Sequence, residues 1–415
     1  MAKIKFLKKD FEKFYKINDK LLELISMFGT PVDELKDELE IEIFPNRPDL
    51  ISLHGFVRSF DLFSGKQKKL KRYKVHKPLK NFKVIIHPSV KDIRPFTACA
   101  IVKGLKFDDA SIKELMDLQE KLHSTVGRNR KKLAIGIYPL EKLSLPIKYE
   151  AISPEKIKFV PLEFSKELNG NQILSEHPKG KEFASLLKGK NKFPIFVDSK
   201  ENILSMPPII NSQYSGKVDK CTKDIFIECS GFQFEILKKT LNILLTTFAD
   251  MGGEIYQMEL CYPKNYSLNK RKEVSPSFKE EKMKINLRNV NSLLGLNLSE
   301  KDMAILLSKM GHSYSKGKVS IAPWRIDILH EVDLIEDIAI AYGYANFVPE
   351  IPKLATTGEE DHESLIRSKF SEILAGAGLL EASSYHLLSQ EDLNKSFNKN
   401  SVKLMNSRTD LPLKL

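Results

Sequence analysis

Two widely separated stretches of the chain share one order of features, although few of their residues are identical. Each begins with an amphipathic helix that ends at a glycine, Gly29 or Gly311, and glycine readily adopts the positive φ that often follows a helix. A short strand of alternating apolar residues follows, and then Pro-x-Arg-x-Asp leads into another helix. The motif residues are Pro45, Arg47 and Asp49 in the first copy and Pro323, Arg325 and Asp327 in the second. The repeat predicts two related small helix/strand modules that are winged-helix-like.

The sequence between the two copies has a different pattern. Short β-rich runs such as FTACAIVKGL, LAIGIYPL and DIFIECSG alternate with turns, and one long helix is expected at SIKELMDLQEKLHSTVG. The polar stretch 265–282 is expected to be a linker. We therefore predict an α+β multidomain chain with four parts: a first module with a basic linker at 1–80, a mixed α+β domain at 81–265, a second module at 280–350, and the beginning of a further α+β domain at 360–415.

The charge balance favours a polyanionic partner. The chain has 66 Lys plus Arg against 54 Asp plus Glu, a formal net charge of +12. Lysines concentrate in a run from Ser64 to Lys80, which is either a solvated linker or a strip that faces phosphates. No apolar run approaches the roughly 20 residues of a membrane span, and the charged N-terminus does not resemble a signal peptide, so we expect a cytoplasmic protein without a membrane partner.

Carboxylates concentrate in the second copy, in an otherwise basic chain. Asp333, Glu336 and Asp337 have helical i, i+3 and i+4 spacing, so we expect them on one face, with Asp327 folded back over the first turn. The opposite face is expected to be a buried stripe of Val332, Ile335, Ile338, Ala339 and Tyr342. Acids in a first helical turn complement the helix dipole, but four carboxylates also suit a hard cation such as Mg²⁺.

The repeat provides an internal control for these acids. The positions of the first copy that correspond to Asp333, Glu336 and Asp337 are Gly55, Arg58 and Ser59. The fold of the module therefore does not require acids there, which favours a special role such as metal binding. The aspartate of the motif occurs in both copies and is open to a structural role such as capping the next helix.

Four motifs together resemble one known family. WRIDILHEVDLIEDIAIAYGY closely resembles the magnesium-binding helical module in the β subunit of phenylalanyl-tRNA synthetase. IEIFPNRPDLISLHGFVRSF resembles the N-terminal region of that subunit, especially in its archaeal and eukaryotic form. LQEKLHSTVGRNRKKLAIGIYPLEKL and MPPIINSQYSGKVDKCTKDIFIECSG resemble its intervening domain. The resemblance covers nearly the whole chain in the order of the family.

The resemblance implies a subunit of an α₂β₂ ligase of protein biosynthesis. The α subunit would hold phenylalanine, ATP and the aminoacylation site, while the β subunit would build the assembly and contact the phenylalanine tRNA. The acids at Asp327, Asp333, Glu336 and Asp337 are implied to bind a Mg²⁺ shared with the α subunit. The family continues into a catalytic-like domain of which only the beginning follows residue 360 here, so a C-terminally shortened subunit is expected.

The resemblance also implies that the middle domain edits, by hydrolysing tyrosine wrongly attached to the phenylalanine tRNA. Editing is physically reasonable because a phenylalanine pocket has limited means to exclude one additional hydroxyl. The matching motifs provide the candidate residues His123, Arg128, Arg130, Asn211, Ser212 and Asp224. A structural role for His123 remains open, as does hydrolysis by a positioned water without a protein nucleophile.

Two other classes of protein compete with this interpretation. A Mg²⁺-dependent nucleic-acid-processing enzyme would need basic residues beside its acids, and the local sequence offers only Arg325 and His330. A winged-helix nucleic-acid-binding protein would need basic recognition helices, whereas LIEDIAIAYGY is acidic and would repel phosphates. Both are weaker than the synthetase interpretation.

Overall fold

The computed structural model describes residues 2–263, 272–351, 353, 358–383, 387–395 and 402. The chain divides into two compact units, Met1–Phe347 and Val348–Leu415. Among the described residues, no helix combines the length and apolar character that crossing a bilayer requires.

The first module forms a three-stranded antiparallel sheet with the strand order β1-β3-β2. Asn18 and Ser52 cap the helices that follow them, because their side chains accept hydrogen bonds from backbone N–H groups of the first turn. The elements are β1 Ala2–Leu7, α1 Lys8–Phe11, α2 Asp19–Met27, β2 Val32–Glu34, β3 Glu38–Ile43, the 3₁₀ helix η1 Pro48–Leu50 and α3 Leu53–Phe63.

The second module repeats this topology, because its sheet has the equivalent strand order β17-β19-β18. Gly29 and Gly311 follow the corresponding helices with φ values of +85° and +83°, which confirms the positive φ expected at both positions. The elements are β17 Glu281–Lys284, α8 Leu287–Leu294, α9 Glu300–Lys309, β18 Ser313–Ser315, β19 Lys318–Ile321, α10 Glu331–Tyr342 and η6 Tyr344–Asn346.

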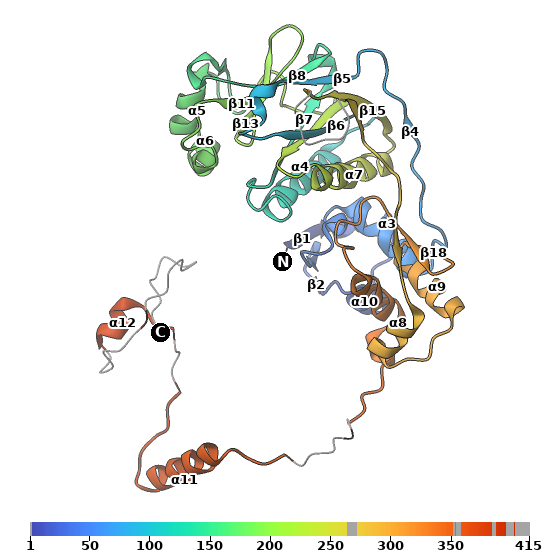
Figure 1. The fold of residues 1–415 in the computed structure, drawn as a ribbon, viewed down its shortest axis with the longest axis vertical. Helices are drawn as coiled ribbons and strands as arrows, with labels where there is room; N and C mark the ends of the chain where they lie inside the picture. Colours follow the sequence, from blue (N-terminus) through green and yellow to red (C-terminus); the bar gives the residue numbers. More distant parts are fainter. Residues whose placement is uncertain are drawn as a thin grey trace. The chain divides into compact units, whose positions relative to one another are not determined.

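The middle of the chain builds a mixed 11-stranded sheet, with helices α4 and α7 packed on it (Figure 1). Its main path runs β13-β12-β11-β8-β5-β15-β6-β14-β7, and β16 and β4 also pair with β15. The strands are β4 Val75–His76, β5 Lys83–Ile86, β6 Phe96–Lys103, β7 Leu133–Pro139, β8 Ile147–Ile152, β11 Phe193–Val197, β12 Ile203–Met206, β13 Ile210–Asn211, β14 Ile225–Gly231, β15 Glu254–Cys261 and β16 Lys272–Ser275, with β9 Lys158–Phe159 and β10 Leu168–Asn169 as a separate pair. The helices are η2 Pro88–Val90, α4 Asp109–Ser124, η3 Leu140–Lys142, η4 Pro154–Lys156, α5 Gly170–Glu176, α6 Pro178–Phe183, η5 Ala184–Leu186 and α7 Phe234–Asp250.

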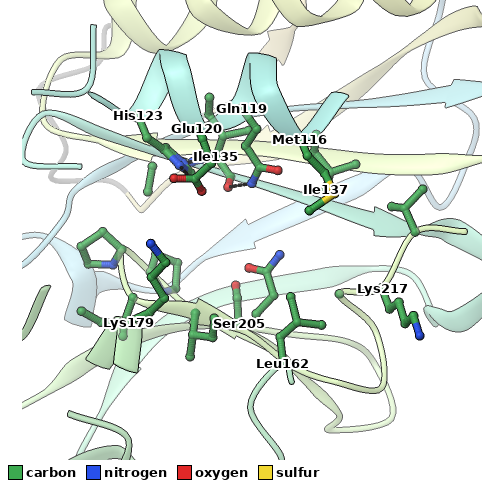
Figure 2. Close-up of a pocket in the computed structure, with 18 of the residues that line it drawn as sticks. Met116, Gln119, Glu120, His123, Ile135, Ile137, Leu162, Lys179, Ser205 and Lys217 are labelled. Atoms are coloured by element: carbon green, nitrogen blue, oxygen red, sulfur yellow. Dashed lines mark hydrogen bonds and ion pairs between the residues drawn. The ribbon is translucent and has the colours of Figure 1, made fainter. Parts of the chain in front are cut away.

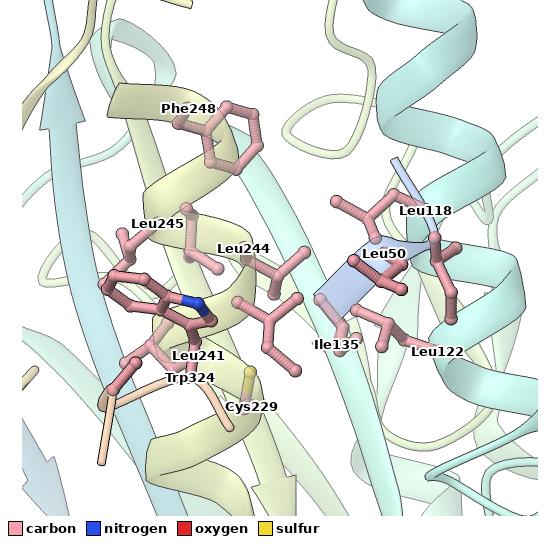
Figure 3. Close-up of a cluster of buried hydrophobic side chains, with 14 of the residues drawn as sticks. Leu50, Leu118, Leu122, Ile135, Cys229, Leu241, Leu244, Leu245, Phe248 and Trp324 are labelled. Carbon is pink, nitrogen blue, oxygen red and sulfur yellow. The ribbon is translucent and has the colours of Figure 1, made fainter. Parts of the chain in front are cut away.

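Helix α7 joins the central sheet to both modules. Figure 3 shows its leucines between Leu50 of the first module, α4 of the central domain and Trp324 of the second module. The Oγ of Ser52 lies 3.0 Å from the Oγ1 of Thr247, and the Nδ2 of Asn242 donates to the carbonyl oxygen of Pro323 at 3.0 Å. One continuous hydrophobic core therefore links the three parts of the first unit.

Two expectations about linkers need correction. The stretch 265–282 is not a linker throughout, since β16 pairs with β15 and β17 begins the second module, while residues 264–271 lie outside the described part. The basic run is also partly ordered into the fold: β4 pairs in parallel with β15, and the hydroxyl of Tyr73 donates to the carboxylate of Asp250 at 2.8 Å. Backbone pairing and aromatic packing override the polar composition of these segments.

The second unit contains two described helices. Helix α11, His362–Gly376, is capped by the carboxylate of Asp361, which accepts from the backbone of Glu363, and α12 is Gln390–Lys395. Helix α11 lies within 360–415, where the sequence predicts the beginning of a further α+β domain. Most of the remaining predicted domain, including 403–415, lies outside the described residues.

Candidate functional site

A cavity of about 660 Å³ opens between α4 with β7 on one side and the segment Ser205–Val218 on the other (Figure 2). Its walls are mainly apolar and come from Ile112, Leu115, Met116, Ile135, Ile137, Leu162, Ile209, Ile210 and Val218. The Nε2 of Gln119 donates to the backbone carbonyl of Ile135 at 2.7 Å, so the polar side chain of α4 is fixed against β7. The cavity is large enough for an aromatic side chain with attached groups.

Ser205, Asn211 and Glu228 form one group among the polar side chains that line the cavity, since each lies within 3.4 Å of the hydroxyl of Tyr138. The hydroxyl of Tyr138 lies behind them, donating to the Oγ of Ser205 at 2.7 Å and approaching the Oδ1 of Asn211 at 3.4 Å. Glu228 pairs with Gly136 across the ladder of β14 and β7, and a Cβ at that glycine would lie only 2.7 Å from the Oε1 of Glu228. The absence of a side chain at Gly136 therefore leaves space for the carboxyl group.

Glu228 is the most unusual group in this cavity. It is 2% exposed, and its Oε2 has no hydrogen-bond partner within the described part of the chain. Burial raises the pKa of Glu228 to about 8, although the guanidinium of Arg94 opposes the shift. The group is therefore mainly a neutral carboxylic acid near pH 7, and its Oε1 lies 3.4 Å from the hydroxyl of Tyr138.

His123 is buried between α4 and β7 rather than exposed on the helix. Its Nε2 accepts a hydrogen bond of 2.8 Å from the backbone N–H of Ile135, and its Nδ1 lies 3.5 Å from the Oε1 of Glu120. Burial lowers the pKa of His123, so the ring is neutral at pH 7. Because the lone pair of Nε2 is already engaged, His123 positions α4 against β7 and is not available as a general base.

The arginines of the predicted basic turn have different environments. Arg130 is buried, and its guanidinium donates to the carbonyl of Ile209 and to Glu120 at 2.8 Å each, which ties the end of α4 to the opposite wall. Arg128 is exposed and does not line the cavity. The turn has positive φ at three successive residues, Arg128, Asn129 and Arg130, between 48° and 63°. Within it, the Arg128 side chain faces solvent and the Arg130 side chain faces the protein interior.

The remaining candidates are only partly brought together. Asn211 lines the cavity, whereas Ser212 is buried beside it, accepting from the backbone N–H of Tyr214 at 3.3 Å, and does not line it. Asp224 lies away from the cavity and accepts from the backbone N–H of Gly104 at 3.0 Å. Sequence reasoning missed Glu228, although a single acid within the buried apolar strand Ile225–Gly231 was a signal that could have identified it.

The acids of the second module do not share one solvent-facing face. Asp337 is buried, and its Oδ2 lies 2.8 Å from both the Nε2 of His312 and the NH2 of Arg325. Arg325 also forms a two-pronged ion pair with Asp327, at 2.9 Å and 2.7 Å. The expected stripe is also wrong at one end, since Val332 is 50% exposed.

Asp333 and Glu336 are the acids that remain closer to solvent. The Oδ2 of Asp333 accepts from the backbone N–H groups of Leu329 and His330, both at 2.7 Å, and so caps α10. Desolvation, reinforced by the carboxylates of Asp337, Asp333 and Asp327, raises the pKa of Glu336. One arginine therefore opposes four carboxylates, but in the part of the chain described no group of three or more His, Cys, Asp or Glu side chains could hold a metal ion.

Comparisons with known proteins agree with this architecture. Residues 283–344 match the family model described as tRNA synthetase B5 domain. The phenylalanine–tRNA ligase beta subunit of Archaeoglobus fulgidus is 40% identical over 90% of this chain and 67% of that protein. The corresponding subunits of Thermococcus sibiricus and Methanococcoides burtonii are 38% and 34% identical, covering 61% and 70% of those proteins.

A solved structure is similar as well. It is an N-terminal fragment of the phenylalanyl-tRNA synthetase beta subunit from Pyrococcus horikoshii, with a TM-score of 0.75, 33% identity, and coverage of 82% of this chain and 99% of the fragment. The fold and the second module define the chain as an aminoacyl-tRNA synthetase polypeptide. It belongs to the family of phenylalanine–tRNA ligase beta subunits, and it spans about two thirds of the length of the curated relatives.

Proposed function

We propose that the cavity between α4 and Ser205–Val218 is an editing site that hydrolyses tyrosine from the phenylalanine tRNA. The observation that carries the proposal is Glu228, a buried, protonated carboxyl group in the cavity lining, one oxygen of which has no hydrogen-bond partner among the described residues. A tyrosyl ring would occupy the apolar walls, and its hydroxyl would satisfy this oxygen.

The physical basis of selectivity is the cost of an unpaired polar group. A phenylalanyl ring would fit the same walls but would leave Glu228 without a partner and displace any water beside it. A site built to bind a hydroxyl can reject the analogue that lacks it strongly, because the buried polar groups of the site then remain unpaired. The editing cavity would therefore favour the tyrosyl ring, whereas a purely apolar aminoacylation site favours the phenylalanyl ring.

A water molecule is the proposed nucleophile of the hydrolysis. The engaged lone pair of His123 argues against activation by this histidine. The side-chain amide of Asn211 and the carbonyls of the cavity wall offer polar contacts that can orient a water toward the ester. The role of the protein is then mainly to bind and position the acylated 3′ end.

The proposal is tested by presenting the chain with phenylalanine tRNA carrying either tyrosine or phenylalanine. We expect hydrolysis of the tyrosyl ester to be about 10-fold faster than that of the phenylalanyl ester, since leaving a buried polar group unsatisfied costs about 1–3 kcal/mol. Equal rates for the two esters, or tyrosyl hydrolysis no faster than in buffer, would contradict the editing function.

We further propose that the chain assembles with an α subunit as α₂β₂ and supports ATP-dependent aminoacylation at the active site of that subunit. The family membership and the B5 match support this role. Co-expression with the α subunit, followed by co-purification and a phenylalanylation assay, tests it independently of editing. A chain that fails to co-purify would exclude the assembly.

We propose that a Mg²⁺ binds at the acidic cluster through fewer of its acids than the sequence suggested. Asp327 and Asp337 are held by Arg325, so Glu336 and the free oxygen of Asp333 are the groups that would face the ion, with further ligands from the α subunit. The bound ion would supply positive charge at the boundary between the subunits and offset the desolvation and the like-charge repulsion that raise the pKa of Glu336.

Thermal unfolding of the co-expressed complex tests this site. At ten times its Kd, Mg²⁺ is expected to stabilise the complex by about 1.4 kcal/mol, and E336Q should abolish most of that gain. E300Q, which removes an exposed acid from the first turn of α9, is the matched control and should retain the full response. An unchanged Mg²⁺ response in E336Q would exclude Glu336 as a ligand.

A further inference from the structure

Glu120 lies on α4 at the opening of the editing cavity. Its side chain is 56% exposed, and Figure 2 shows its carboxylate directed from α4 toward the cavity that it lines. Met116, one helical turn earlier, lines the cavity as well and is also exposed. Glu228, by contrast, is buried in the cavity wall. The two acids therefore mark the accessible end and the enclosed part of one cavity.

The carboxylate of Glu120 is held in one orientation. Its Oε1 accepts from the guanidinium of Arg130 at 2.8 Å and lies 3.5 Å from the Nδ1 of His123. Arg130 is anchored in turn, because it donates to the carbonyl of Ile209 at 2.8 Å. The ring of His123 and the charges of Arg130 and Lys179 lower the pKa of Glu120 to about 2. The carboxylate is therefore ionised near pH 7.

One oxygen of this carboxylate remains open to a ligand. Both contacts described above involve Oε1, and within the described part of the chain Oε2 has no hydrogen-bond or ion-pair partner. Lys179 lies across the opening in Figure 2, but its ammonium group pairs with Glu182 at 3.0 Å. Glu120 therefore presents an oriented, negatively charged oxygen to a cation that enters the cavity.

An aminoacyl ester carries such a cation next to its ester group. The α-ammonium is bonded to the same carbon as the ester carbonyl, so both lie at the end of the amino acid opposite to the ring. Because the bulk of the tRNA stays outside, a ring bound beside Glu228 leaves the ester and the ammonium group near the opening. An ammonium group that leaves water for a mainly apolar cavity needs a carboxylate to offset its lost hydration.

Glu163 is the other acid of the lining that is a candidate for this contact. It is exposed, and its carboxylate has no hydrogen-bond or ion-pair partner among the residues that the structure describes, so no neighbouring cation orients it. A carboxylate that is already oriented loses less conformational entropy when it binds a ligand. Glu120 is therefore better placed than Glu163 to bind an ammonium group.

We propose that the carboxylate of Glu120 binds the α-ammonium group of the tyrosyl ester and thereby orients the ester at the opening of the cavity. The proposal rests on the editing function, because it requires an aminoacyl ester in this cavity. It also defines the class of substrate. An ester whose amino group is acylated has no ammonium group and leaves Glu120 unpaired, so N-acylated and peptidyl esters are poor substrates.

The test uses two stable analogues of the acylated 3′ end. The first is the tyrosyl amide of 3′-amino-3′-deoxyadenosine, and the second is its desamino counterpart, in which hydrogen replaces the α-ammonium group. Isothermal titration calorimetry measures the Kd of both for the full chain and for E120Q, E163Q and D117N. Asp117 is an exposed acid of α4 that does not line the cavity, so D117N is a control with the same change of charge as E120Q. Circular dichroism first establishes that the variants are folded.

The unmodified chain should bind the tyrosyl amide about 10-fold more tightly than the desamino analogue, which is the lower end for a hydrogen bond to a charged group because Glu120 is partly exposed. E120Q should reduce this ratio to about 2-fold or less, whereas D117N and E163Q should retain it. A loosened cavity wall would weaken both analogues alike and leave the ratio unchanged, so the ratio reports the charge contact. A ratio that E120Q leaves unchanged, or that E163Q abolishes instead, would overturn the proposal.

Hydrolysis of tyrosyl-tRNA separates this proposal from the editing function. The unmodified chain should hydrolyse the N-acetyltyrosyl ester about 10-fold more slowly than the tyrosyl ester. A chain that hydrolyses both esters at the same rate and binds both analogues equally retains an editing function, and only the role of Glu120 is overturned. A chain that neither hydrolyses the tyrosyl ester nor binds either analogue contradicts both proposals.

Discussion

We expect hydrolysis of the tyrosyl ester to fall about 10- to 100-fold when Glu228 is replaced by leucine, because the proposed partner of the phenolic hydroxyl is lost and the hydroxyl remains unpaired, at a cost of about 1–3 kcal/mol. Hydrolysis of the phenylalanyl ester should fall much less, or rise, since the apolar leucine no longer penalises an apolar ring. The measurement is single-turnover deacylation of both esters with excess protein. A parallel loss on both substrates would show that Glu228 does not carry selectivity.

The near-isosteric variant E228Q separates selectivity from folding. Glutamine keeps a donor and an acceptor at the same place, so most of the selectivity should remain.

The folded pKa of Glu228, about 8, lies above the value of the unfolded chain, so the folded state retains a proton that the unfolded state has released. Stability should therefore decrease as the pH rises from about 4 to 8 in the unmodified chain, and E228Q should weaken this decrease. Denaturant titrations across this pH range measure the difference.

Replacing Arg325 by methionine is expected to lower the free energy of unfolding by about 3–5 kcal/mol, because it removes the partner of two carboxylates that are largely buried. Asp327 and Asp337 would then repel each other within the second module. Chemical denaturation of the full chain measures the loss. R288M, at an exposed arginine of α8, is the control and should stay within about 0.5 kcal/mol.

Two further measurements distinguish lost charge pairing from lost packing in R325M. Adding D327N and D337N to R325M should recover part of the stability, since neutral side chains need no counter-charge. Arg325 lowers the pKa of Asp337, so its stabilising effect is present above about pH 4 and is lost as the pH falls below the pKa of the unfolded chain. The stability of R325M should therefore not show this loss at acidic pH. If R325M and the unmodified chain lose stability in the same way as the pH falls, the ion-pair explanation is excluded.

Sequence reasoning misplaced the acids of the second module because it treated their helix, α10, as if only one of its faces were covered. Helical spacing correctly placed Asp333, Glu336 and Asp337 within one turn of α10, but it could not show that this helix is covered on more than one side. In the folded chain His312 and Arg325 approach Asp337 from the segments before β18 and after β19. Periodicity describes one isolated helix, whereas burial depends on all the elements packed around it.

Glu228 illustrates the opposite kind of miss. The strand Ile225–Gly231 was predicted from its apolar residues, and its one acid received no attention. All seven residues of the strand are buried, and the strand lies between β6 and β7 in the sheet. Glu228 therefore cannot face solvent as a surface acid does. Sequence reasoning instead selected Asp224, which lies just before the strand and away from the cavity.

By itself, the sequence determined the repeated modules, the strands and long helix of the central domain, and the family, because these depend on local patterns of apolar residues, turn residues and motifs. Only the tertiary structure decided which polar groups face a cavity and which acids are neutralised internally. Those outcomes depend on contacts between residues far apart in the sequence, such as the ion pair of Arg58 with Asp250 at 2.7 Å. Burial and electrostatic pairing are properties of the packed chain, and no local pattern specifies them.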